Sequence, residues 1–141
     1  MHWLLHQRLF RYAKGIDGGA IRWNLAWLLM IVITPFATKL LTVEADAFQV
    51  QFTVYAAGQA LAGICLRQAF AAVRRAGLLR DHTPPAAIAD TLAWVTAVTV
   101  TFSVSVPLAP VTHSASLCWL LLPAVRFALH RAGRPGRAAR A

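Results

Sequence analysis

The chain has 141 residues, a formal net charge of +9, and a composition that is 58% hydrophobic but only 13% charged. A soluble domain is usually about one quarter charged, so this composition argues against a soluble globular domain and against a nucleic-acid-binding protein, despite the basic excess. No Asp, Glu, Lys or Arg falls within residues 23–38, 47–66 or 91–125. Uncharged stretches of this length predict a multipass membrane protein.

The first 21 residues are too short and too basic for a complete membrane span. Their apolar side chains alternate with histidines and arginines, the apolar ones being Trp3, Leu4, Leu5, Leu9 and Phe10. This pattern is typical of an interfacial amphipathic helix, and it also suits the inner end of a membrane helix. Glycines on both sides of Asp17 predict a turn directly after this segment.

A bilayer core of about 30 Å needs about 20 apolar residues per helix. On this basis we place four membrane spans near residues 23–43, 47–66, 91–108 and 114–130. Residues 1–132 then form one membrane domain, followed by a basic cytosolic tail at residues 133–141. The predicted fold class is an all-α multipass membrane helical bundle.

The first span contains Pro35, which cannot donate a backbone hydrogen bond and therefore favours a packing kink. We expect the hydroxyls of Thr34 and Thr38 to cover the carbonyl that this proline frees. Lys39, near the end of the span, can reach the membrane interface with its charged end.

The second span carries small residues at helical spacing, Ala56, Ala60 and Gly63, with Gly58 nearby. Small residues let membrane helices approach closely, so this face is expected to be a helix contact. Gln59 lies near the middle of the span. A lone amide at such a position is more often a hydrogen-bonding link between helices than a ligand for a substrate.

Residues 71–89 are expected to form the main cytosolic loop, and Asp90 to cap the next helix. In the third span, Thr96, Thr99 and Ser103 share one helix face. Their hydroxyls either line a wet path or bond back to carbonyls of their own helix. We favour the second alternative, because such bonds are common in membrane helices.

The basic residues fall on one side of the predicted membrane. With four spans, thirteen of the fourteen Lys and Arg share that side: Arg8, Arg11, Lys14, Arg22, Arg67, Arg74, Arg75, Arg80, Arg126, Arg131, Arg134, Arg137 and Arg140. Cytosolic loops are enriched in such residues, so both termini are predicted to be cytosolic in a multi-pass protein of the cell membrane. The basic side would also attract anionic lipid headgroups.

No catalytic pattern is present. The sequence contains no Ser/His/Asp set, Walker loop, GxGxxG or HExxH motif, and no pair of carboxylates within a span. We therefore expect no enzyme, no cofactor, and no catalytic, cofactor-binding or metal-ligating residue. The span centres also lack ionisable side chains, which disfavours a pump or proton-coupled carrier.

Residues 3–41 carry a more specific pattern than composition alone. They contain a Trp–x–x–His motif followed by Leu-Phe, then an acidic residue, a Trp-Asn pair and a Pro-Phe-x-Thr motif. The matching residues are Trp3, His6, Leu9, Phe10, Asp17, Trp23, Asn24, Pro35, Phe36 and Thr38. This segment resembles the transmembrane protein 175 family, the potassium channels of lysosomes and their bacterial relatives.

The resemblance implies a six-helix unit in which our four spans are helices three to six and residues 1–12 are the inner end of helix two. It also implies a homo-oligomer in the lipid bilayer whose central pore passes potassium ions. The family's pore is lined by its first helix, with an Arg-x-x-x-Phe-Ser-Asp motif that this sequence does not contain. A start codon assigned too late, a true truncation, or a separate chain that supplies the missing helices would each explain this. Because Met1 falls inside a helix that the resemblance identifies, we favour an N-terminally incomplete product.

Five residues are the candidates for pore support. By the resemblance, Trp3 and His6 would hydrogen-bond toward the pore helix, although interfacial anchoring explains them equally well. Asn24 is expected to cap or join the cytosolic end of the first span, and Pro35 and Thr38 to shape its outer half. The alternative function is a non-conducting membrane scaffold or partner subunit that uses the small-residue face of the second span.

Overall fold

The computed structural model describes residues 2–42, 47–108 and 122–132. Within these ranges the chain forms helices α1 (His2–Phe10), α2 (Gly18–Leu41), α3 (Phe48–Arg75), α4 (Pro85–Leu108) and α5 (Leu122–Ala132). The same ranges contain no β-strand beyond one isolated bridge between Ala13 and Leu79. The predicted all-α fold is therefore confirmed.

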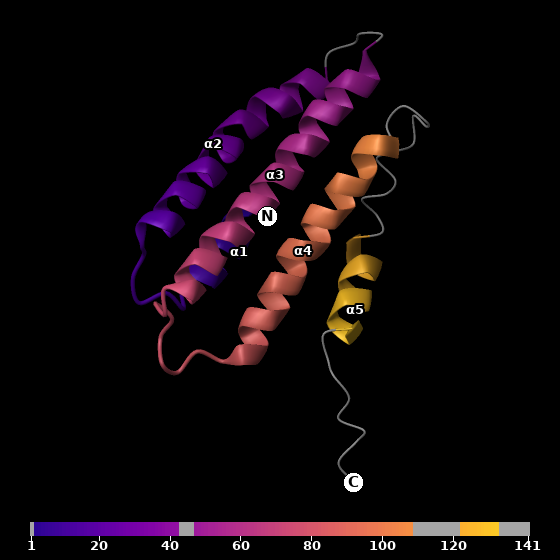
Figure 1. Ribbon diagram of the computed structural model, residues 1–141. Coiled ribbons are helices and arrows are strands. Elements are labelled where there is room, and N and C mark those ends of the chain that lie inside the picture. Colours follow the sequence, from indigo (N-terminus) through magenta and orange to yellow (C-terminus); the bar gives the residue numbers. More distant parts are fainter. Residues whose placement is uncertain (1, 43–46, 109–121, 133–141) are drawn as a thin grey trace.

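The three long helices lie side by side with alternating direction, and α3 lies between α2 and α4 (Figure 1). Each of the three is long and apolar enough to cross a membrane. A membrane-type helical bundle is thus confirmed at the level of three spans. The predicted fourth span, residues 114–130, lies partly outside the described residues, and its second half overlaps the 11-residue helix α5 beside α4. The tail at residues 133–141 also lies outside them.

Helix α2 begins earlier than the sequence analysis predicts. Asp17 is its N-cap, and the Asp17 carboxylate accepts a hydrogen bond from the backbone N–H of Ala20 at 2.9 Å. This cap satisfies a donor that the first helical turn leaves without a partner. The helix therefore starts at Gly18, whereas the prediction of residue 23 followed the last basic residue before the apolar run. Asn24 lies inside the helix and does not cap it.

The hydroxyls around Pro35 do not have the predicted partners. Thr34 Oγ1 donates to the carbonyl of Met30 at 2.8 Å, and Thr38 Oγ1 donates to the carbonyl of Thr34 at 2.9 Å. A hydroxyl has one proton to donate, and both protons are used. The carbonyl four residues before Pro35, that of Ile31, is therefore not covered by either threonine, and this prediction is wrong.

The loop between the second and third spans is shorter than predicted. Helix α3 continues past Arg67 to Arg75, because Ala69, Phe70 and Val73 keep an apolar face buried against the other helices. Helix α4 begins at Pro85, a residue that suits the first helical position because its missing N–H is not needed there. The predicted loop of residues 71–89 is thus reduced to residues 76–84, and Asp90 lies within α4 and is not its cap.

The predicted small-residue face of α3 is a close helix contact. A Cβ added to Gly63 would collide with the Thr99 side chain and would lie 3.5 Å from the Thr99 Cα of α4. Ala56 and Ala60 are also buried, whereas Gly58 has open space at its Cα. The predicted back-bonding in α4 is confirmed for two hydroxyls, since Thr96 and Thr99 donate to the carbonyls of Leu92 and Val95.

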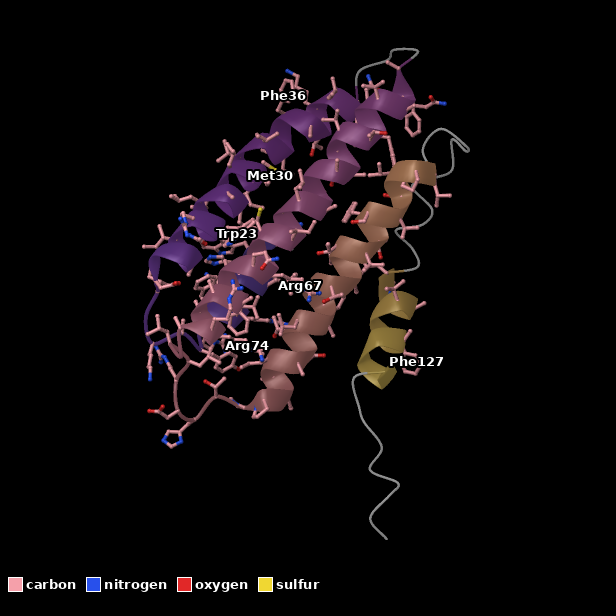
Figure 2. All side chains as sticks on the ribbon, viewed as in Figure 1. Trp23, Met30, Phe36, Arg67, Arg74 and Phe127 are labelled. Atoms are coloured by element: carbon pink, nitrogen blue, oxygen red, sulfur yellow. The ribbon has the colours of Figure 1, made fainter. Side chains whose placement is uncertain are left out.

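The largest core cluster lies where α1 meets the long helices. Its buried members come from four helices: Leu5, Leu9, Trp27, Ala62, Cys65, Leu66, Phe70 and Val95. By contrast, the outer face of α2 exposes large apolar side chains, among them Val32 and Phe36 (Figure 2). An exposed apolar face of this length suits contact with lipid.

Candidate functional site: an aromatic and polar junction

The candidate site begins with one hydrogen bond between two helices. His6 of α1 and Asn24 of α2 are joined from Nε2 to Oδ1 at 2.7 Å, with the imidazole donating to the amide oxygen. The turn at residues 11–17 reverses the chain, so α1 and the first turns of α2 face each other. The prediction that Asn24 joins the beginning of the first span to a neighbour is therefore confirmed.

Aromatic rings surround this hydrogen bond. The His6 ring stacks on Trp27, with centroids 4.3 Å apart and an interplanar angle of 14°, and on Phe10, with centroids 4.5 Å apart. Trp3 stacks on His6 at 5.9 Å and on Trp27 at 6.4 Å. Stacked rings at these separations attract each other beyond the apolar area that they bury. They therefore hold the imidazole in the orientation that its hydrogen bond to Asn24 needs.

A second polar link lies one helical turn before His6. His2 Nε2 is 3.0 Å from Gln59 Oε1 of α3, and Gln59 Nε2 donates to Thr34 Oγ1 of α2 at 3.2 Å. Thr34 in turn donates to the carbonyl of Met30. A chain of hydrogen bonds thus ties α1, α3 and α2 together. The predicted role of Gln59 as a link between helices is confirmed.

Three of the five candidate residues meet at this junction. Trp3, His6 and Asn24 belong to it, whereas Pro35 and Thr38 lie farther along α2, about 16 Å beyond Asn24 for Pro35 at the rise of an α-helix. The Thr38 hydroxyl bonds to the carbonyl of Thr34 in its own helix. Pro35 and Thr38 are therefore features of α2 and not of the junction.

Sequence analysis missed two members of the junction, His2 and Trp27. Each lies one helical turn from a residue that was identified, His2 four positions before His6 and Trp27 three positions after Asn24. Residues at these spacings share a helix face, so a search one turn to either side would have found both. Trp27 is completely buried, although apolar side chains around it on α2 are exposed.

The hydrogen bonds of the junction join α1, α2 and α3. Two of its buried polar atoms, His2 Nδ1 and Trp27 Nε1, have no hydrogen-bond partner within the part of the chain that the structure describes. In the same part, no three His, Cys, Asp or Glu side chains come together in a way that would hold a metal ion.

Basic side chains gather at the end of the bundle next to the junction. This end contains the α1–α2 turn and the α3–α4 loop (Figure 1), and its basic residues are Arg8, Arg11, Lys14, Arg22, Arg67, Arg74, Arg75 and Arg80. Arg67 reaches from α3 to α4, where its Nη1 donates to Thr96 Oγ1 at 2.6 Å (Figure 2). Near the opposite end of the described helices, Lys39 carries the basic charge. The two ends of the bundle therefore differ strongly in charge.

No protein-family model, curated protein or solved structure matches this chain. Evidence for its function therefore comes from the geometry of the junction, from the charge difference between the two ends of the bundle, and from the sequence pattern of residues 3–41.

Proposed function

We propose that this chain is a multipass subunit of a cell-membrane assembly for passive potassium transport, similar to the transmembrane protein 175 family. The observation that carries the proposal is the contact between Trp3, His6 and Asn24. These residues define much of the sequence resemblance, and they meet through a 2.7 Å hydrogen bond and a ring stack although 18 positions separate His6 from Asn24. A motif whose members meet in space supports a shared role better than a motif on separate surfaces does.

In the proposed channel, the junction supports the helix that lines the pore. Trp3 belongs to the stack yet is 57% exposed, so its outer edge offers a surface against which another membrane helix packs. Trp3 and His6 thus act as positioning residues, and potassium itself does not touch them.

The proposed topology has four spans, with α2, α3 and α4 as the first three and the region of α5 as the fourth. The basic end faces the cytosol together with both termini. In the proposed homo-oligomer, the pore lies on the symmetry axis and the exposed apolar face of α2 contacts lipid.

A potassium-flux assay tests the transport proposal. The assembly is purified from its native membrane and reconstituted into potassium-loaded liposomes, and efflux is measured by a potassium electrode. We expect efflux that falls severalfold in Asn24→Leu, because this substitution leaves the imidazole without its acceptor, and that is unchanged in Thr38→Val, which changes α2 outside the junction. Absence of efflux from the wild-type assembly would overturn the proposal.

The second candidate is a non-conducting membrane scaffold or partner subunit. It is favoured by the buried amide of Gln59, which bonds to both His2 and Thr34 and so links three helices. The same reconstitution distinguishes the two candidates. A scaffold gives an intact oligomer of defined mass with no potassium efflux, whereas a channel subunit gives both.

Cysteine labelling tests the proposed orientation. Thr42→Cys lies just after α2, and His82→Cys lies in the α3–α4 loop, at opposite ends of the bundle. In a background with both native cysteines replaced, a membrane-impermeant maleimide added to whole cells should label position 42 and leave position 82 unlabelled until the cells are opened. The reverse pattern would invert the topology.

A further inference from the structure

The basic end of the bundle contains a pocket between two segments that are fixed to each other. Ala13 and Leu79 form an antiparallel bridge, in which the backbone N–H of Lys14 donates to the carbonyl of Leu78 and that of Arg80 to the carbonyl of Tyr12, both at 2.9 Å. The α1–α2 turn is thereby joined to the α3–α4 loop. Side chains on both segments consequently keep a defined relative position.

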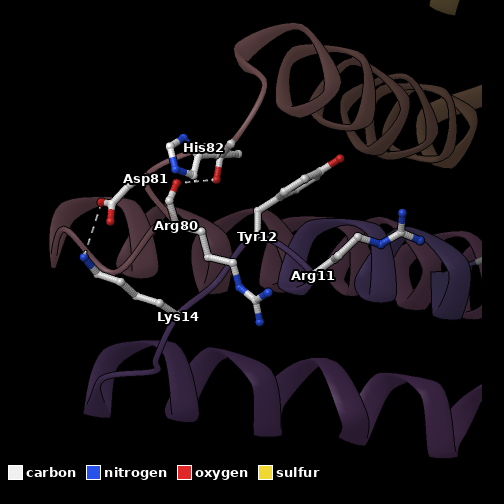
Figure 3. A pocket seen from close by; sticks show the side chains of 7 residues that line it. Arg11, Tyr12, Lys14, Arg80, Asp81 and His82 are labelled. Atoms are coloured by element: carbon white, nitrogen blue, oxygen red, sulfur yellow. Dashed lines mark hydrogen bonds and ion pairs between the residues drawn. The ribbon is translucent and has the colours of Figure 1, made fainter.

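The pocket has a volume of about 490 Å³ and opens to the surface (Figure 3). Its walls come from both fixed segments: Arg11, Tyr12, Lys14, Arg80, Asp81, His82 and Thr83. The volume falls in the range of small-molecule sites, about 300–1,000 Å³. In Figure 3 the Arg80 guanidinium lies between Lys14, whose charged end turns to Asp81, and Arg11, whose charged end points away from Arg80. Three basic side chains therefore line one hollow, with Arg80 at its middle.

The only carboxylate in the pocket wall is Asp81, and it is loosely held. Lys14 Nζ is 3.9 Å from Asp81 Oδ1, and the two side chains are 48% and 87% exposed. Exposed ion pairs at this distance contribute little to stability. Arg80 uses Nε to donate to the carbonyl of Ala13 at 3.3 Å. An anion that offers several oxygens can therefore displace Asp81 from Lys14 while it binds the guanidinium nitrogens of Arg80.

We propose that this pocket binds the phosphate group of an anionic phospholipid headgroup. Phosphate oxygens suit arginine and lysine because charge-assisted hydrogen bonds to them are the strong ones. The pocket lies at the end of the apolar helices, where headgroups lie if these helices cross a membrane, and Ile16 before α2 and Ile21 in its first turn are exposed nearby. The site is independent of potassium transport, so failure of one proposal leaves the other standing.

A lipid titration tests this site. The full chain in zwitterionic detergent is titrated with short-chain phosphatidylglycerol, with phosphatidylcholine, and with glycerol 3-phosphate as a water-soluble source of the same phosphate chemistry. The apparent Kd is taken from the shift in the thermal midpoint. We expect saturable binding of phosphatidylglycerol, weak binding of phosphatidylcholine, and no binding of glycerol 3-phosphate at the same concentrations. Equal binding of glycerol 3-phosphate would overturn the assignment to a lipid.

Matched variants locate the binding. Arg80→Gln and Lys14→Gln should each raise the Kd for phosphatidylglycerol about tenfold, and Asp81→Asn should lower it. Arg22→Gln removes the same charge from the same end of the bundle outside the pocket, so its Kd should stay within about twofold of the wild-type value. Because Arg80 also bonds the carbonyl of Ala13, Lys14→Gln serves as the variant that leaves the bridge untouched. An equal loss in Arg22→Gln and Lys14→Gln would show diffuse attraction and overturn the pocket.

Discussion

Helices α2 and α3 are both long and apolar enough to cross a membrane, yet α2 lies at the edge of the bundle and α3 at its centre. In the most apolar 18-residue stretch of each helix, 11% of the residues of α2 and 61% of those of α3 are buried in the bundle. Mean hydropathy runs the other way, at 1.6 for α2 and 1.2 for α3. Hydropathy therefore identifies a helix that can cross a membrane, but it does not place that helix in the bundle.

Small residues and one buried amide side chain place α3 in the centre of the bundle. Ala56 and Gly63 let its neighbours approach, and Gln59 bonds to both α1 and α2. Helix α2 lacks such a face, and its few buried positions are Ala20, Trp27 and Ala37. Because apolar side chains gain nothing by leaving lipid for another apolar surface, close packing and hydrogen bonds decide which helix is central.

Trp27 is the strongest exception to the exposure of α2, and its loss should have the largest effect. Trp27→Ala removes a completely buried ring from the core cluster and from the stack on His6, at an expected cost of about 3–5 kcal/mol. The matched control is Trp23→Ala, which removes the same side chain from a position on α2 that is 39% exposed. Thermal unfolding in detergent measures both variants. Equal destabilisation would mean that α2 has no preferred buried face.

The next largest effect is expected where α3 approaches α4. Gly63→Val places side-chain atoms against Thr99 and should destabilise the bundle by about 1–3 kcal/mol. Gly58→Val is the control, since it makes the same change in the same helix at a position with open space. Both changes have the same effect on helix propensity, so the difference in thermal midpoint isolates the contact. If Gly63→Val melted at as high a temperature as Gly58→Val, the close approach of α3 to α4 would not explain why α3 is central.

The sequence predicts the bundle better than it predicts the helix ends. Uncharged stretches are easy to see, but the prediction ended the second span before Arg67, the first charge. The helix continues because Phe70 and Val73 bury an apolar face beyond that charge, and because Arg67 extends sideways to Thr96. A charge thus marks where a helix can leave the hydrocarbon region, not where it stops being a helix.

The candidate site was predictable only in part for a related reason. The threonines of α4 bond to carbonyls one turn away in their own helix, and Gln59 is a lone amide near the middle of a span, so residue type and position suffice to predict their roles. The burial of Trp27 depends on α1 folding back along α2, and no period in the sequence reports a contact between residues 21 positions apart, such as His6 and Trp27. The bridge between Ala13 and Leu79 is likewise a tertiary feature.

A smaller effect is expected for the amide that links three helices. Gln59→Leu removes the bonds to His2 and Thr34 and leaves a buried imidazole nitrogen without its partner, at an expected cost of about 1 kcal/mol. Gln49→Leu makes the same change at an exposed position of α3 and should be close to neutral. Thermal midpoints of the two variants give the comparison. Stabilisation by Gln59→Leu would show that packing alone keeps α3 in the centre.

The smallest and most specific effect concerns the cap that begins α2. The hydrogen bond from the backbone of Ala20 lowers the pKa of the Asp17 carboxyl. Because the folded pKa is depressed, the charged cap stabilises the fold above the unfolded pKa of about 3.9, and this stabilisation is lost as the pH falls through the lower, folded value. Asp17→Ala should therefore melt below the wild type at about pH 7 and converge with it in acid.

Asp17→Asn separates the charge of this cap from its hydrogen bond. Asparagine also caps helices well, so this variant should melt close to the wild type at about pH 7. Because asparagine does not titrate, position 17 should then contribute nothing to the loss of stability in acid. Thermal midpoints of the three proteins, measured from about pH 7 down to about pH 3, give the test. If Asp17→Ala melts with the wild type at neutral pH, then α2 needs no cap. Its early start would then follow from packing such as that of Ala20 with Ala72 and Val73, so packing would set where the long helices begin as well as where they lie.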